Sequence, residues 1–130
     1  MNSIIKLKSY SDGELILSEE YKGSWEKKGR YLRYEYEDKE GALTHMVVCF
    51  EDEGLYRLES QGERKLLISC TDGVGKAILS IGAHSLEGGV SKFRSQIKES
   101  TEGYKTEINY VLSFSVDQKT RTKLIIEAKQ

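Results

Sequence analysis

Apolar and polar side chains alternate along the whole segment from Tyr104 to Val116. One side of the segment carries Tyr104, Thr106, Ile108, Tyr110, Leu112, Phe114 and Val116. The other side is polar apart from Val111. A helix would spread such a pattern around its circumference, so the alternation predicts a long antiparallel strand with one buried face. We therefore expect the first set of side chains, Phe114 included, to point into the core.

Shorter alternating runs fill most of the remaining chain. They are Ile4–Tyr10, Glu14–Lys27, Arg30–Glu37, Leu43–Glu51, Gly54–Ser60, Arg64–Thr71, Lys76–Ala83, Val90–Glu99 and Thr120–Lys129. Turn-forming residues separate the runs, and the chain has twelve glycines and no proline. Because proline cannot donate to a strand ladder, its absence suits a continuous sheet. The spacing predicts one all-β domain over residues 1–130, an antiparallel barrel or sandwich of about eight to ten strands.

Three runs carry more specific expectations. In the second run the expected inward row is Leu15, Leu17, Glu19, Tyr21, Gly23 and Trp25. Gly23 inside this row predicts a bend or bulge. The inward residues expected after Leu43 are Met46, Val48 and Phe50. The run Val90–Glu99 fits either a strand or a short helix, since Phe93 and Ile97 are one helical turn apart.

Composition narrows the class of protein. The 130 residues suffice for one core without disulfide or metal staples. A formal net charge of −1 disfavours nonspecific nucleic-acid binding. The chain has no apolar run of signal-peptide or membrane-span length, so we expect a cytoplasmic protein without a membrane segment. Cys49 and Cys70 are then expected to be reduced thiols in strands.

The residues that catalyse reactions or bind cofactors in other proteins form no complete set in this chain. The stretch Thr71–Ala77 resembles a phosphate-binding loop, but Cys70 stands where its first glycine belongs and Ala77 replaces the hydroxyl residue. A turn between strands is the better interpretation. His45 and His84 have no partner at metal-ligand spacing. We therefore expect no enzymatic activity, no cofactor and no metal.

A set of inward-facing residues forms the candidate ligand site. It comprises Glu19, Tyr21, Trp25, Tyr34, Tyr36 and Tyr110. A tyrosine or tryptophan offers an apolar body and a polar tip, which together orient an amphipathic molecule. A carboxylate inside a barrel needs a hydrogen-bond or charge partner, so Glu19 is either such a partner for a ligand or a solvated residue at the rim. The aromatic residues are equally suited to plain core packing.

The stretch from Gly23 to Asp38 reads Gly-Ser-Trp-Glu-Lys-Lys-Gly-Arg-Tyr-Leu-Arg-Tyr-Glu-Tyr-Glu-Asp. It combines a glycine, an aromatic residue, a charged turn, Tyr-Leu-x-Tyr and an acidic end. This order resembles the YwiB-like family, small bacterial proteins of unknown function with a calycin-like, or lipocalin-like, β-barrel. The resemblance implies that fold for the whole chain, and it implies no activity and no catalytic residues.

Two functions fit a small barrel of this kind. The first is non-enzymatic binding of one small apolar or amphipathic molecule, because a barrel of this size either just fills with side chains or encloses one ligand. The second is a filled barrel that acts as a protein interaction module or homodimer through an outer face, near Val47 and Cys49 or near Val111. The sequence leaves both open.

Overall fold

Strands account for nearly all of the chain that the structure describes. The computed structural model describes residues 2–29, 31–37, 44–50, 55–61, 64–100 and 103–129, and within them it has ten β-strands and no helix. The strands are β1 (Asn2–Ser11), β2 (Glu14–Lys28), β3 (Tyr31–Glu37), β4 (Thr44–Phe50), β5 (Leu55–Gln61), β6 (Arg64–Thr71), β7 (Val74–Ile81), β8 (His84–Ser100), β9 (Gly103–Ser115) and β10 (Gln118–Lys129). The all-β prediction is confirmed. The run Val90–Glu99, which fitted either a strand or a short helix, is part of strand β8.

The sheet closes on itself. Each strand pairs antiparallel with the next along the chain, and β1 pairs with β10 to complete the barrel. At the closure Ile5 lies opposite Ala128 and Leu7 lies opposite Ile126, and all four side chains are buried. A closed sheet has no free edge, so every strand of the ring has a neighbour on both sides. The chain is thus a ten-stranded up-and-down barrel.

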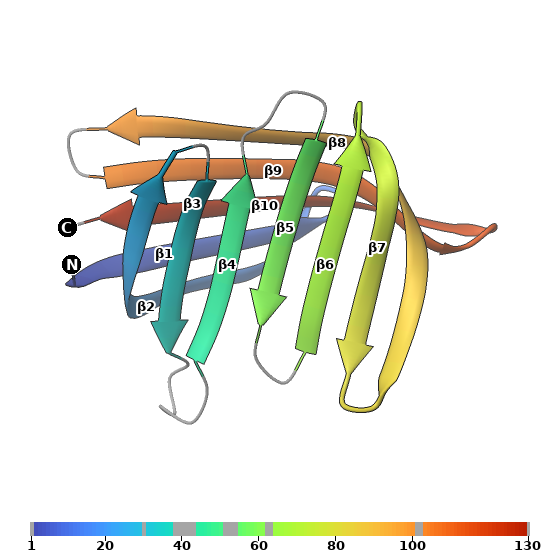
Figure 1. Cartoon of the computed structure of the whole chain (residues 1–130), viewed down its shortest axis with the longest axis horizontal. Helices are drawn as coiled ribbons and strands as arrows, with labels where there is room; N and C mark the ends of the chain where they lie inside the picture. Colours follow the sequence, from blue (N-terminus) through green and yellow to red (C-terminus); the bar gives the residue numbers. More distant parts are fainter. Residues whose placement is uncertain are drawn as a thin grey trace.

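Two long strands connect two sets of strands that cross each other (Figure 1). In this view β3 to β7 lie side by side along one common axis with alternating directions, while β1, β9 and β10 run across them. The strand β2 pairs with β1 along most of its length and with β3 from Gly23 to Lys28. The strand β8 pairs with β7 from His84 to Val90 and with β9 up to Ser100. Each long strand therefore carries the sheet around a corner.

Gly23 marks the corner of β2. A Cβ atom at this position would lie 2.3 Å from the backbone oxygen of Glu35, and 3.0 Å from side-chain atoms of Ile5 and Tyr36. The absent side chain therefore lets β3 approach β2 closely where the pairing changes. The bend that the sequence predicts at Gly23 therefore lies at this corner of β2.

A bulge marks the corner of β8. The register against β9 shifts between Ser91 and Arg94, and Lys92 has a φ of 52°. The amide of Phe93 donates to the carbonyl of Gly73 over 3.0 Å, which ties the bulge to the β6–β7 turn. Bulges sharpen local twist, and this one turns β8 away from β7 as the strand continues along β9.

The core consists of inward residues from strands on all sides of the barrel. Its buried members include Ile5, Leu32, Tyr34, Ile68, Ala77, Val90, Phe93, Ile108 and Ile126. The hydroxyl of Tyr34 on β3 lies 2.7 Å from the hydroxyl of Thr106 on β9, and both residues are fully buried. Since β2, β1 and β10 separate these two strands in the ring, this hydrogen bond crosses the interior. Side chains therefore fill the middle of the barrel.

Four of the expected face assignments are wrong, and one of them is Val116, which is 92% exposed just beyond the end of β9. Val47 on β4 was expected on the outer face, but it is only 3% exposed and lies opposite buried Tyr34. Leu15 is 49% exposed because a register shift between Ser9 and Tyr10 takes it out of the inward row. Phe114 is 42% exposed because the pairing of β8 with β9 ends one residue before it. Val47 therefore belongs to the core and offers no outer docking face.

Candidate functional site

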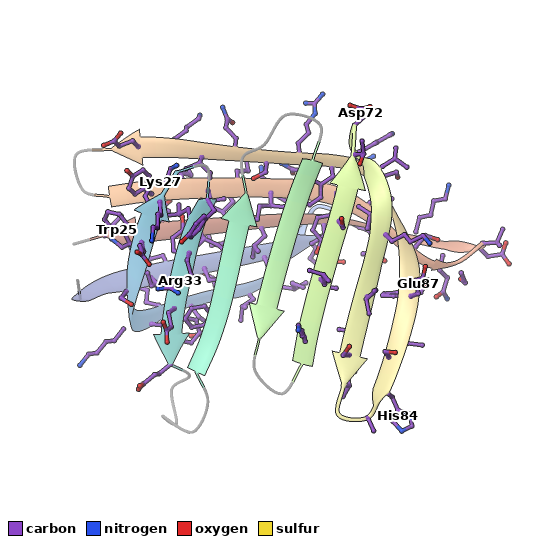
Figure 2. All side chains as sticks on the ribbon, viewed as in Figure 1. Trp25, Lys27, Arg33, Asp72, His84 and Glu87 are labelled. Atoms are coloured by element: carbon purple, nitrogen blue, oxygen red, sulfur yellow. The ribbon has the colours of Figure 1, made fainter. Side chains whose placement is uncertain are left out.

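Trp25 lies near the end of the barrel where both chain termini lie (Figures 1 and 2), and it belongs to a group of four aromatic side chains. They are Tyr21 and Trp25 of β2, Tyr36 of β3 and Tyr104 of β9, and together they form the aromatic cluster. The rings of Tyr21 and Tyr36 are stacked, with centroids 4.7 Å apart. The rings of Trp25 and Tyr104 meet nearly edge to face, with centroids 4.8 Å apart and an interplanar angle of 72°.

The strand pairing explains why these rings meet. Trp25 lies opposite Tyr34, and Gly23 lies opposite Tyr36. Because glycine presents no side chain beside Tyr36, the ring of Tyr36 packs on Tyr21, the next inward residue of β2. Closure of the sheet through β1 and β10 then brings β9, and with it Tyr104, up to Trp25.

The aromatic cluster rests on a fully buried layer. Tyr34 and Thr106 form the cross-barrel hydrogen bond immediately below it. Tyr34 is the inward residue next to Tyr36 on β3, and Thr106 is the inward residue next to Tyr104 on β9. Tyr21, Trp25 and Tyr104 are only partly buried, although they point inward. The site is therefore a partly exposed group of aromatic rings above a filled interior.

Two hydrogen-bonding atoms in the barrel wall have no partner in the part of the chain that the structure describes. They are the indole Nε1 of Trp25 and the hydroxyl Oγ of Ser95 on β8, and both atoms are buried. Buried polar atoms nearly always have a protein or water partner, so we expect each of these two atoms to bind a water molecule or a ligand atom. An indole N–H donates only, whereas a hydroxyl donates or accepts. A bound group with an acceptor atom near Trp25 would satisfy the first of them.

Burial sets the protonation of the interior tyrosines. It raises the pKa of Tyr36 to about 12, with a smaller contribution from the neighbouring Tyr21. Burial likewise raises the pKa of Tyr110, while a hydrogen bond with Thr122 acts in the opposite direction. Both phenols are therefore neutral at physiological pH and act as hydrogen-bonding groups, not as charges.

The raised pKa of Tyr36 predicts a loss of stability in alkali. Its folded-state pKa of about 12 exceeds the ordinary value of 10.0, so the folded protein keeps this proton in a pH range where the unfolded chain releases it. The free energy of unfolding should hold below about pH 10 and fall between about pH 10 and 12. Urea unfolding across this range should show the fall, and Tyr36→Phe should make it shallower. An identical slope in the variant would contradict the assignment.

The structure brings together four of the six predicted site residues: Tyr21, Trp25, Tyr34 and Tyr36. Tyr110 lies elsewhere, stacked on Phe93 with centroids 6.0 Å apart. Glu19 lies opposite Leu7 in register and is partly buried.

Sequence reasoning missed Tyr104 and Thr106 as members of the site, and it gave no sign of the buried hydroxyl of Ser95. The first two were visible in the inward row of the long strand. Their contact with β2 and β3 depends on closure of the barrel, which alternation alone does not fix. Ser95 lies after the bulge at Lys92, where the parity of β8 changes.

The other chemically interesting residues lie apart from the aromatic cluster. Asp72 and His84 are at turns on either side of β7, far from Trp25 in Figure 2. Asp72 and Gly73 form the β6–β7 turn, as expected for the stretch that resembles a phosphate loop. Cys70 is a buried free thiol whose pKa is raised by burial, whereas the side chain of Cys49 lies outside the described part. In the residues that the structure describes, no group of histidine, cysteine and acidic side chains is arranged to hold a metal ion.

The described residues contain no helix that is long and apolar enough to cross a membrane. No protein-family model matches the sequence, and no match was found among curated proteins. The fold is similar to that of the YwiB protein from Bacillus subtilis, with a TM-score of 0.64 over 99% of this chain and 92% of that chain. The two sequences are 18% identical, and the likeness therefore shows a common fold.

Proposed function

We propose that this chain is a cytoplasmic, non-enzymatic binding protein that takes one small amphipathic molecule at the aromatic cluster. We further propose that it is a member of the YwiB-like family and has a calycin-like barrel, on the strength of the fold likeness and the Gly23–Asp38 sequence pattern. The observation that carries the binding proposal is the shallow, partly exposed group of inward aromatic rings beside the orphan Nε1 of Trp25.

The chemistry of the aromatic cluster defines the ligand class. The stacked pair Tyr21 and Tyr36 and the edge-to-face pair Trp25 and Tyr104 offer apolar ring surface for a flat or aliphatic body. The Trp25 indole offers a hydrogen-bond donor to an acceptor on that body. Burial raises the pKa of Tyr36 to about 12, so its phenol is uncharged, and a neutral ligand fits best beside it. The hydrogen-bonded floor of Tyr34 and Thr106 limits how deeply the ligand enters.

The interaction-module alternative has support from another part of the molecule. Leu86 on β8 is 58% exposed, and Phe114 on β9 is 42% exposed. A Cβ built on Gly88 would lie 2.7 Å from the Phe114 ring, which places that ring against β8 close to Leu86. Exposed apolar side chains in neighbouring strands are the feature that favours a partner or a second copy of the chain. Analytical ultracentrifugation of the protein and of Phe114→Ser distinguishes a dimer from a monomer.

The sole tryptophan makes the binding proposal directly measurable. Trp25 is the only tryptophan of the chain, so its emission reports on the aromatic cluster alone. We expect the neutral fluorescent probe N-phenyl-1-naphthylamine to bind saturably at one site and to change Trp25 emission. Removal of the Tyr36 ring in Tyr36→Ala should weaken the probe about tenfold, because it removes one wall of the site.

A matched variant controls for loss of packing. Tyr110→Ala removes an interior tyrosine that lies outside the aromatic cluster, and it should leave the probe affinity unchanged. Absence of saturable binding by folded protein, for this probe and for a series of fatty acids and fatty alcohols, would reject ligand binding in favour of the interaction module.

A further inference from the structure

A groove of about 480 Å³ crosses the outer wall of the barrel, away from the aromatic cluster. Its lining includes Asp12, Ser91, Lys92, Val111, Lys119 and Arg121. These residues come from the β1–β2 turn, the bulge of β8 and the outer faces of β9 and β10. Val111, the apolar residue that interrupts the polar outer row of β9, lies in register between Ser91 and Arg121. The groove therefore has an apolar base between polar walls.

The charge in this groove is unbalanced. It holds three cationic side chains, Lys92, Lys119 and Arg121, against the single carboxylate of Asp12. Two other hollows on the described surface have the opposite balance. One is lined by a single arginine with two glutamates, and the other by two lysines with three glutamates. In a chain of net charge −1 this groove is thus a local positive site.

Asp12 does not neutralise its cationic neighbours through ion pairs. Its carboxylate oxygen accepts the backbone N–H of Arg121 over 2.9 Å, and its own backbone N–H donates to the carbonyl of Arg121 over 2.8 Å. These two bonds fix the β1–β2 turn to β10. No described residue forms an ion pair with the cationic groups of the groove. Elsewhere on the barrel Lys123 pairs with Glu107, and Lys76 with Glu87.

The backbone at Lys92 is unfavourable for a lysine. Its φ of 52° is a left-handed conformation, which glycine adopts without the steric penalty that a Cβ brings. A bulge position of this kind is one where glycine is common. Lys92 thus places a cationic side chain in the groove, although a glycine would adopt its backbone conformation with less strain.

We propose that this groove binds a small organic phosphate. Lysine and arginine side chains are the usual donors to phosphate oxygens, and three of them line this groove together with only one carboxylate, that of Asp12. The hydroxyl of Ser91 adds a neutral donor. A volume of about 480 Å³ exceeds what one phosphate group needs, so the remaining space and the apolar base of Val111 accommodate the organic part of the ligand. The site is independent of the aromatic cluster.

Substitution of Lys92 by glycine separates binding from stability. Isothermal titration calorimetry at low ionic strength with inorganic phosphate, inorganic pyrophosphate and glucose 6-phosphate should show one site, with affinity falling as salt is added. Lys92→Gly should weaken binding about tenfold, because one charge-assisted hydrogen bond is lost. It should leave the urea midpoint unchanged or higher, since glycine relieves the strained φ. Lys119→Gln and Arg121→Gln should weaken binding likewise.

Lys98→Gln is the matched control. Lys98 is an exposed lysine of the same strand outside the groove, so its loss changes the net charge equally and should leave phosphate affinity unchanged. Equal weakening by Lys98→Gln and Lys92→Gly would overturn the site in favour of general charge attraction. Absence of binding for all three probes at millimolar concentration would overturn it too. So would binding only to phosphatidylserine vesicles or to a single-stranded oligonucleotide, because either result would assign the groove to a macromolecular surface.

Discussion

Replacement of Tyr34 by alanine should lower the free energy of unfolding by about 3–5 kcal/mol. The ring is fully buried and spans the interior from β3 to Thr106 on β9. Its loss leaves a cavity at the centre of the barrel and removes the only described hydrogen-bond partner of the Thr106 hydroxyl. Urea unfolding followed by circular dichroism measures the effect. Tyr10→Ala, which removes a tyrosine from the outer face beside Lys123, should cost less than about 1 kcal/mol.

A double-mutant cycle isolates the cross-barrel hydrogen bond. Tyr34→Phe keeps the ring and leaves the Thr106 hydroxyl unpaired, and should cost about 1–3 kcal/mol. Thr106→Val removes the Thr106 hydroxyl that contacts the Tyr34 hydroxyl and should have a similar effect. The double variant removes both polar groups and should be more stable than the sum of the two losses predicts. Additive losses would mean that the two hydroxyl groups do not interact across the barrel.

The sequence predicted the elements of the barrel well because antiparallel strands are local. Alternation shows which residues can share a face, and a short glycine- or aspartate-rich turn forces consecutive strands to be neighbours. The row from Tyr104 to Leu112 is inward as expected. The same row fails at Phe114 because a period of two says nothing about where the neighbouring strand leaves the sheet.

Irregular positions account for the other errors. The register shift between Ser9 and Tyr10 displaces Leu15, and the bulge at Lys92 changes the parity of β8, yet neither site carries a glycine that would signal it. On β4 the apolar residues from Met46 to Cys49 are consecutive, so alternation could not choose between Val47 and its neighbours. Such errors exchange inward for outward residues over a whole strand.

The candidate site was predictable only in part, for a topological reason. Tyr21, Trp25, Tyr34 and Tyr36 lie on adjacent strands of one hairpin, so parity was enough to group them. Tyr104 joins them only because β1 pairs with β10 and closes the ring. Contacts that depend on closure bring together residues far apart in sequence, and local pattern contains no information about them.

Gly23→Ala should be among the most damaging single-methyl additions in the chain, with a loss of about 3 kcal/mol or more in the free energy of unfolding. The added Cβ would lie 2.3 Å from the Glu35 backbone oxygen, and backbone has to move to relieve that contact. Gly23 has no left-handed φ, so the loss would come from the close approach of β3 and not from conformational strain. The movement would also separate Tyr36 from Tyr21, and Trp25 emission should therefore change in the folded variant. Gly89→Ala, whose added Cβ would lie 4.0 Å from the Ser113 oxygen, is the matched control and should stay within about 0.5 kcal/mol. If the two substitutions proved equally mild in urea titrations, β2 and β3 would not be in contact at this corner, and the aromatic cluster would lose the geometry that defines it.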